Sequence, residues 1–199
     1  MTVNWNERYR QRDTPWNLEK PALAFEKLAQ GGWSLNDHVY ALPAGAKLWL
    51  PGCGLGHDAA VFGDRGYDVI GVDLAPLAIA SADERYGHLA QFQLQDGLHP
   101  AKSHHGQFDA VMEHTFFCAI DPACRKAYAR AVAAVLKPGG KLFGIFWLHQ
   151  QAGGPPFDVT RHELKDLFLD AFDWLAFEPN PWPMPARKPQ EWLLVLSKK

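Results

Sequence analysis

A glycine-rich segment in the first third of the chain has the residue types and spacing of a nucleotide-binding loop. Gly52, Gly54 and Gly56 lie in the stretch 50–58, LPGCGLGHD, between an apolar run and a helical pattern. Glycines allow a tight turn and a close approach of a ligand to the main chain, and the N–H groups that begin the next helix favour an electron-rich group. Asp73 ends the following apolar run, where its carboxylate can hold ribose hydroxyls. Together these residues predict a site for a ligand that contains a nucleoside.

The spacing of the glycines separates two kinds of nucleoside cofactor. A dinucleotide loop has the pattern GxGxxG, whereas the glycines here follow one another as GxGxG. The pattern therefore disfavours an NAD(P)-dependent oxidoreductase, which is the least favoured alternative. GxGxG with a downstream acid resembles the S-adenosylmethionine loop of class I methyltransferases. In that superfamily, the place of Asp96-Gly97 is where a side chain and a backbone amide hold adenine.

Alternating strand and helix patterns surround these residues and must position them. Short apolar runs at 46–50, 67–72, 92–94, 108–112 and 141–148 predict strands, with helical patterns between most of them. Strands separated by helices pair in parallel through right-handed crossovers. Two later strand candidates cover 172–177 and 192–196. Because only a proline-rich stretch lies between them, we predict an α/β sandwich with an antiparallel hairpin at its C-terminal edge.

Length, composition and charge set the class of protein. With 199 residues, 47% hydrophobic and 21% charged, the chain has the size and composition of one globular domain. Its 20 lysine and arginine residues against 22 aspartate and glutamate residues leave no basic excess for binding nucleic acid. Neither an apolar run of the ~20 residues that a membrane helix needs nor a signal-peptide pattern occurs, so we expect a cytoplasmic protein. Without a long apolar edge or heptads, we expect a monomer.

Metal and disulfide chemistry is not expected. Cys53, Cys118 and Cys124 are an odd number without CxxC spacing, and the only histidine cluster is His104-His105 in a polar stretch. Structural zinc sites draw four ligands from characteristic spacings of cysteine and histidine. We therefore predict no metal at the functional site.

Seven motifs occur in one order along the chain. They are the aromatics Trp5, Tyr9 and Trp16, then PGCGLGHD (51–58), VIGVDLAPLAI (69–79), FDAVMEHTFFCAIDP (108–122), LKPGGKL (136–142), GGPPFDV (153–159) and NPWPMPARK (180–188). This series resembles the thiopurine S-methyltransferase family, and most closely its thiol and halide methyltransferase branch. The resemblance implies a Rossmann-like class I methyltransferase fold in one domain, 1–199, with a mostly parallel seven-stranded sheet and an antiparallel C-terminal edge. It also implies S-adenosylmethionine as the methyl donor and a small-molecule acceptor such as a thiol, a thiopurine, hydrosulfide or a halide.

The resemblance also implies roles for individual residues, with 1–30 as an N-terminal lid over the donor. The implied cofactor-binding residues are Trp5, Tyr9, Trp16, Gly52, Gly54, Gly56, Asp73, Leu74, Asp96, Gly97, Glu113 and His114. The implied acceptor pocket contains Phe117, Trp147, Pro155, Pro156 and Phe157. His114 is the implied catalytic residue and stands where relatives often have tyrosine or arginine. Two further departures are Tyr9, where tryptophan is usual, and Gln150-Gln151, where close relatives often carry an acid–histidine pair.

Several of these roles have alternatives. His114 either accepts a proton from a neutral thiol or hydrogen-bonds to it, or it only packs on the donor. The N-terminal aromatics either close over the donor or fasten their segment to the body, Phe117 lies in the core or in the pocket wall, and Arg187 is interpreted as a solvated charge. At the level of function, the alternatives are a small-molecule N- or O-methyltransferase and an S-adenosylmethionine-binding protein without turnover.

Overall fold

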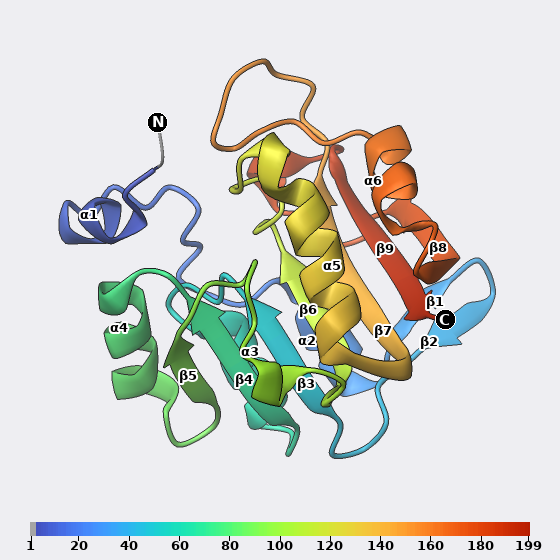
Figure 1. Cartoon of the computed structure of the whole chain (residues 1–199), viewed down its shortest axis with the longest axis horizontal. Helices are drawn as coiled ribbons and strands as arrows, with labels where there is room; N and C mark the ends of the chain where they lie inside the picture. The colour runs from blue at the N-terminus through green and yellow to red at the C-terminus, as the bar shows by residue number, and fades with distance from the viewer. Residues whose placement is uncertain (1–2) are drawn as a thin grey trace.

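Seven strands form the central sheet of the computed structural model, which describes residues 3–199 (Figure 1). Their order across the sheet is β5-β4-β3-β6-β7-β9-β8. Their bounds are β3 (Lys47–Pro51), β4 (Asp68–Asp73), β5 (Gln91–Leu94), β6 (Phe108–His114), β7 (Leu136–Trp147), β8 (Phe172–Pro179) and β9 (Glu191–Lys198). The strands from β5 to β7 pair in parallel, whereas β9 runs antiparallel to both of its neighbours. The predicted mostly parallel sheet with an antiparallel C-terminal hairpin is confirmed.

Helices cover both faces of this sheet (Figure 1). The α-helices of the described residues are α1 (Trp5–Arg10), which lies away from the sheet, α2 (Leu23–Gln30), α3 (His57–Gly63), α4 (Pro76–Tyr86), α5 (Arg125–Val135) and α6 (Arg161–Phe168). The pair α2 and α3 packs on one face, α5 and α6 pack on the other, and α4 lies beside the edge strand β5. No helix within residues 3–199 combines the length and the apolar character needed to cross a bilayer.

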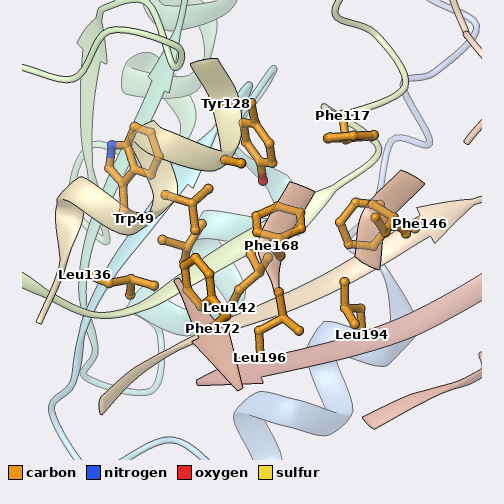
Figure 2. Close-up of a cluster of buried hydrophobic side chains, with 14 of the residues drawn as sticks. Trp49, Phe117, Tyr128, Leu136, Leu142, Phe146, Phe168, Phe172, Leu194 and Leu196 are labelled. Atoms are coloured by element: carbon orange, nitrogen blue, oxygen red, sulfur yellow. The ribbon is translucent and has the colours of Figure 1, made fainter. Parts of the chain in front are cut away.

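Side chains alternate along the central strands between two hydrophobic cores. In β3, Leu48 and Leu50 face the core under α2 and α3, whereas Trp49 faces the core under α5 and α6. In β9, Val195 faces the core under α2 and α3, whereas Leu194 faces the core under α5 and α6. Figure 2 shows the second core, where aromatic rings from the strands and helices interleave. Because both faces are covered, the central strands are apolar on both sides, which is typical of parallel sheets.

Five strands and α-helices lie outside the sequence-based prediction: the hairpin of β1 (Trp33–Leu35) and β2 (His38–Tyr40), and the helices α1, α2 and α6. The hairpin strands have three residues each, too few for an alternating pattern to be recognised. The helix α6 does have a sequence signal. The Oγ1 of Thr160 accepts a hydrogen bond from the N–H of Glu163 at 3.1 Å, in the T-x-x-E order of a capping box.

The N-terminal helix α1 lies away from the sheet and beside α4 (Figure 1). The side-chain oxygen of Asn6 accepts a hydrogen bond from the N–H of Leu77 at 3.0 Å, and no residue of α1 is buried. Residues 16–20 then line the glycine loop on the way to α2. Residues between Tyr9 and Lys20 therefore contact the glycine loop that follows β3, where the nucleoside site is predicted.

Candidate active site

The glycine loop follows β3 and has a backbone conformation that requires glycine. Gly52 and Gly54 have φ angles of +63° and +54°, in the left-handed region that favours glycine. A Cβ on Gly52 would lie 2.2 Å from Cδ2 of Phe116, which comes from the segment after β6. At this position the conformation and the close packing both exclude a side chain.

Asp73 ends β4 with its carboxylate against the loop. Its Oδ2 accepts a hydrogen bond from the N–H of Gly54 at 3.0 Å, and its Oδ1 accepts one from the N–H of Ala75 at 2.9 Å. Burial raises the pKa of this carboxyl, and the hydrogen bonds offset part of the rise. Each carboxylate oxygen has about two lone-pair sites, so both keep a free acceptor position. The site therefore fits a ligand that presents hydroxyl donors, such as a ribose.

Asp96 and Gly97 follow β5 on the same side of the sheet. One carboxylate oxygen of Asp96 accepts from the N–H of Leu98 at 2.8 Å, and the other lies 2.7 Å from Nδ1 of His99. Gly97 is buried, and a Cβ on it would lie 3.1 Å from Cζ of Phe116. The ring of Phe116 therefore touches both the glycine loop and the predicted adenine position, a role in the donor site that the sequence analysis did not assign to it. Leu74 is 52% exposed beside this region.

The three predicted aromatics of the N-terminal segment pack on one another. The Nε1–H of Trp16 donates to the hydroxyl of Tyr9 at 3.2 Å, and the ring of Trp5 meets Trp16 edge-on, with 5.3 Å between centroids. The guanidinium of Arg8 lies 4.4 Å from the centroid of Trp16. Burial and the nearby Asp73 raise the pKa of Tyr9 well above its usual range. The structure thus brings Tyr9 and Trp16 to the glycine loop, with Trp5 behind Trp16.

A cavity of about 80 Å³ lies between the N-terminal segment, the glycine loop and the end of β6. The N-terminal segment contributes Tyr9, Trp16, Asn17, Leu18 and Lys20. The loop and the first turn of α3 contribute Gly52, Cys53, Gly54, Leu55, His57 and Asp58, and the end of β6 contributes His114 and Thr115. Predicted donor residues and the predicted catalytic histidine therefore line one space.

His114 is paired with a carboxylate that the sequence analysis did not single out. Its Nδ1 lies 2.7 Å from Oδ2 of Asp58, in the first turn of α3. The other carboxylate oxygen of Asp58 accepts from the N–H of Ala22 at 2.8 Å. Burial alone would raise the pKa of Asp58, but the neighbouring His114 and the hydrogen bonds from His114 and Ala22 lower it overall. The carboxylate is therefore ionised beside the imidazole at neutral pH.

The second imidazole nitrogen of His114 faces a buried arginine. The Nη1 of Arg187 lies 3.5 Å from Nε2 of His114 and 3.3 Å from Oε1 of Glu191. Only 8% of Arg187 is exposed, so its interpretation as a solvated surface charge is wrong. Its guanidinium also lies 5.2 Å from the ring centroid of Trp147. Burial is tolerated because Glu191 supplies a compensating charge.

Glu113 and Phe117 lie away from the cavity, on the opposite side of β6 from His114. Glu113 is fully buried, and its two carboxylate oxygens accept from the N–H of Phe117 at 2.9 Å and the hydroxyl of Tyr128 at 2.6 Å. Burial raises the pKa of Glu113 to about 7, against the effect of these hydrogen bonds. Phe117 is fully buried against Tyr128 and Phe146 (Figure 2). Successive side chains of a strand point to opposite faces, which explains why the structure does not bring Glu113 to the site with His114.

The remaining pocket residues belong to the rim around Arg187 and the segment 153–157. Trp147 ends β7 beside Arg187, and its buried Nε1 has no hydrogen-bond partner among residues 3–199. The N–H of Phe157 donates to the carbonyl of Cys118 at 2.7 Å and ties its segment to the loop after β6. Pro155 is half-buried and Pro156 exposed beside it. None of these four residues lines the 80 Å³ cavity, so their place in an acceptor pocket stays a prediction.

Comparison with known proteins identifies the family. The model of the family described as "Thiopurine S-methyltransferase (TPMT)" matches residues 1–190. The chain belongs to this family. "Probable thiol methyltransferase 2" and "Thiocyanate methyltransferase 1", both from Arabidopsis thaliana, are each 29% identical to this family member over 196 residues, which are 94% of this chain and 81% of each relative.

Solved structures agree with this family assignment at the level of the fold. The 1,6-didemethyltoxoflavin-N1-methyltransferase of Burkholderia thailandensis, solved with S-adenosylhomocysteine bound, superimposes with a TM-score of 0.71 at 20% identity and covers 97% of this chain and 84% of its own. A TehB-like SAM-dependent methyltransferase of Corynebacterium glutamicum gives 0.70 at 17% identity, with 98% and 97% covered. The family and the fold together make the chain an S-adenosylmethionine-dependent methyltransferase.

Proposed function

We propose that the chain transfers the methyl group of S-adenosylmethionine to a small soft nucleophile, a thiol, thiopurine, hydrosulfide or halide, by in-line displacement. The observation that carries the proposal is the cavity that Gly54 lines on its donor side and His114 on its acceptor side. The names of the two plant relatives, a thiol and a thiocyanate methyltransferase, support a sulfur acceptor.

The donor side is formed by residues at the ends of β3, β4 and β5. Asp73 holds the ribose hydroxyls with the acceptor positions that Gly54 and Ala75 leave free. Asp96 and the backbone of Gly97 hold the adenine, with Phe116 beneath them. When bound there, S-adenosylmethionine supplies an electrophilic methyl group on a sulfonium sulfur. The absence of a side chain at position 52 lets the ring of Phe116 pack against the loop, and the main chain of Gly52 and Gly54 lines the cavity.

For this reaction the protein must mainly align the acceptor with the methyl group and exclude water. A soft nucleophile such as thiolate or iodide attacks the methyl carbon without a covalent enzyme intermediate. Because a cationic donor and an anionic acceptor neutralise each other, a water-poor site favours the reaction. Correct orientation alone contributes up to about 7–11 kcal/mol. Trp147 and Arg187 do not line the cavity but lie beyond His114, where they would orient such an acceptor through an apolar and a cationic group.

The N-terminal segment, predicted as 1–30, acts as a lid in this proposal, and its moving part ends before α2, because Phe25 and Leu28 of α2 are buried in the core. Sites for small molecules and cofactors have volumes of about 300–1,000 Å³, whereas the cavity under Tyr9 and Trp16 has about 80 Å³. The donor therefore enters only when the N-terminal segment moves away from the glycine loop. The exposed helix α1, which has no buried residue, is the part that moves at least cost. When the segment returns, Tyr9 and Trp16 exclude water from the reacting groups.

A panel of acceptors tests the proposed function. The purified chain is incubated with S-adenosylmethionine and one acceptor at a time. The acceptors are hydrosulfide, methanethiol, thiophenol, a thiopurine and iodide, and the controls are a phenol and an amine. Production of S-adenosylhomocysteine is measured, and binding of the same product is measured separately by calorimetry. We expect turnover with sulfur acceptors or iodide and none with the phenol or the amine.

Two results would contradict the proposal. Turnover confined to the phenol or the amine would establish an O- or N-methyltransferase on this scaffold. Tight binding of S-adenosylhomocysteine with no turnover of any acceptor would leave a binding protein. Asp73→Asn serves as a control for the donor site, because it weakens ribose binding and should reduce turnover with every acceptor alike.

A further inference from the structure

We infer that Asp58 is a positioning residue that fixes His114 with its lone pair on Nε2, and that the acceptor is therefore a thiol that arrives protonated. This inference rests on the proposed function and narrows its acceptor class. The geometry carries it: one imidazole nitrogen faces a carboxylate and the other faces a guanidinium. Iodide and preformed thiolate need no proton acceptor, whereas a protonated thiol does.

The carboxylate decides which nitrogen of His114 carries the proton. Oδ2 of Asp58 lies 2.7 Å from Nδ1, and an ionised carboxylate only accepts hydrogen bonds. The low pKa of Asp58 keeps that carboxylate ionised. The proton of the neutral imidazole therefore lies on Nδ1, and the lone pair lies on Nε2. The same arrangement orients the histidine in a serine-protease triad.

The guanidinium on the other side requires the same tautomer. Nη1 of Arg187 lies 3.5 Å from Nε2, and a guanidinium only donates. A proton on Nε2 would place two donors face to face, whereas a lone pair there is compatible with Arg187. Glu191 holds the guanidinium in place from behind at 3.3 Å. Two independent neighbours thus select one protonation site.

Asp58 also connects His114 to the N-terminal segment. Its Oδ1 accepts from the N–H of Ala22 at 2.8 Å, immediately before α2, and the ring of Phe25 in α2 meets the imidazole edge-on at 5.9 Å. The imidazole is only 14% exposed. Its orientation is therefore fixed by α2, α3 and the turn that carries Arg187 together. The titratable or charged groups around it are Asp58, His57, Arg187, Glu191, Glu113, Lys20 and Tyr9.

The resulting proton transfer balances. As the thiol sulfur forms its bond to the methyl carbon, the bond from that carbon to the donor sulfur breaks, and its electron pair leaves on that sulfur. The thiol proton moves to the lone pair on Nε2 of His114, and Arg187 turns away from the protonated nitrogen while it keeps its ion pair with Glu191. The imidazolium that forms is stabilised by the carboxylate of Asp58. The positive charge lost from the donor thus reappears on His114, and the proton later leaves to water.

Asp58→Asn is the variant that tests the inference, because it reverses the tautomer while conserving the shape. The amide oxygen of the substituted side chain still accepts from Ala22, but the amide N–H now faces Nδ1 of His114 and requires a lone pair there. ¹⁵N–¹H correlation spectra of the ligand-free protein, assigned with His114→Gln, report which ring nitrogen carries hydrogen. We expect a protonated Nδ1 in the wild-type protein and a protonated Nε2 in Asp58→Asn. A protonated Nε2 in the wild-type protein would overturn the inference, whatever the folding of the variant.

Activity supplies the second readout. With methanethiol at pH 7, where thiols are mostly protonated (pKa about 8.5 for a free cysteine), Asp58→Asn should lower kcat at least about 100-fold, the lower end of general base catalysis. With iodide the loss should stay below about threefold, and with methanethiol it should shrink as the pH rises toward the thiol pKa. Asp64→Asn, an exposed change of the same type just after α3, should leave both rates unchanged.

The positioning role of Asp58 and the proposed methyl transfer are tested by different outcomes. Equal losses with methanethiol and iodide would remove the positioning role of Asp58 and leave the proposed methyl transfer intact. An absence of turnover with every acceptor in the wild-type protein would instead remove the proposed function, and the spectra would still show whether Asp58 fixes the tautomer.

Discussion

The ring of Phe116 occupies the space that a side chain on Gly52 would need, because a Cβ there would come within 2.2 Å of its Cδ2. Gly52→Ala also strains the backbone, since φ is +63° at this position. We expect the variant to lose about 2–3 kcal/mol of unfolding free energy. Its affinity for S-adenosylhomocysteine should fall at least about tenfold, because the loop must shift. Urea unfolding and calorimetric titration measure the two effects.

Gly45→Ala is the matched control for this substitution. Gly45 has a φ of +66°, but a Cβ on it would meet nothing within 4 Å. Only the backbone strain then remains, which costs about 1 kcal/mol, and ligand affinity should not change. Equal losses of stability at the two glycines would show that strain, and not the contact with Phe116, sets the cost at position 52.

Glu113 predicts a pH dependence of stability. Burial raises its pKa from 4.5 to about 7, so the folded protein binds more protons than the unfolded chain between these values. The free energy of unfolding therefore falls as the pH rises through this range and levels off above it. In Glu113→Gln the amide oxygen can still accept from the N–H of Phe117, the amide N–H can donate to the hydroxyl oxygen of Tyr128, and the titration is removed. Relative to this variant, the wild-type protein should lose up to roughly 3 kcal/mol from pH 4.5 to pH 7, at about 1.36 kcal/mol per pKa unit.

The measurement is urea unfolding of both proteins at several pH values. Glu84→Gln, which removes an exposed carboxylate from α4, serves as the control and should follow the wild-type curve. A Glu113→Gln curve parallel to the wild-type curve would mean that Glu113 titrates at its ordinary value in the folded protein.

The parts of the fold and of the site that could be predicted are those marked by a pattern of neighbouring residues in the sequence. Gly52 directly follows the short apolar run of β3 and Asp73 ends that of β4. Their places at the edge of the sheet therefore follow from parallel pairing. The C-terminal hairpin followed from the missing helix between two strands. The helix α6 could have been found as well, because Thr160 and Glu163 have the spacing of a capping box.

The buried polar cluster could not be predicted in this way. His114 lies 56 positions from Asp58 and 73 from Arg187 in the chain, and no pattern along the sequence records that they meet. Arg187 follows a proline-rich stretch, and charged residues are rarely buried unless they are paired. For its partner Glu191, too, the sequence does not show whether the carboxylate is exposed or buried. These side chains are buried because β9 pairs antiparallel with β7 in a register that places Glu191 opposite Trp147.

Two ion pairs of this protein should differ in their effect on stability because they differ in burial. Arg187 and Glu191 have side chains only 9% and 2% exposed, whereas Lys137 and Asp109 are 45% and 28% exposed. Arg187→Ala leaves a carboxylate buried with fewer partners, and we expect a loss of about 3 kcal/mol. Lys137→Ala should cost less than about 1 kcal/mol. Urea unfolding at pH 7 measures both, and similar losses would show that Glu191 is adequately stabilised by Asn180 and the N–H of Met184 alone.

Binding of S-adenosylhomocysteine, the product formed from the methyl donor, should protect the N-terminal segment from cleavage by trypsin. Arg12 is exposed in the turn after α1, within the segment that moves in the proposed function to admit a ligand and then closes over it through Tyr9 and Trp16. We expect saturating S-adenosylhomocysteine to slow cleavage there at least about fivefold, because the closed segment opens less often. Gel electrophoresis or mass spectrometry over time measures the rate.

A defect in ligand binding should abolish this protection if closure is the cause. Asp73→Asn weakens the ribose contact without touching the N-terminal segment, so its cleavage rate should be the same with and without S-adenosylhomocysteine at the concentration that protects the wild-type protein. Trp16→Ala removes the indole that donates to Tyr9 and should be cleaved quickly even when the ligand is bound. Cleavage of the wild-type protein at one rate with and without bound ligand would mean that residues 1–30 are a fixed wall of the site and that the donor enters by another route.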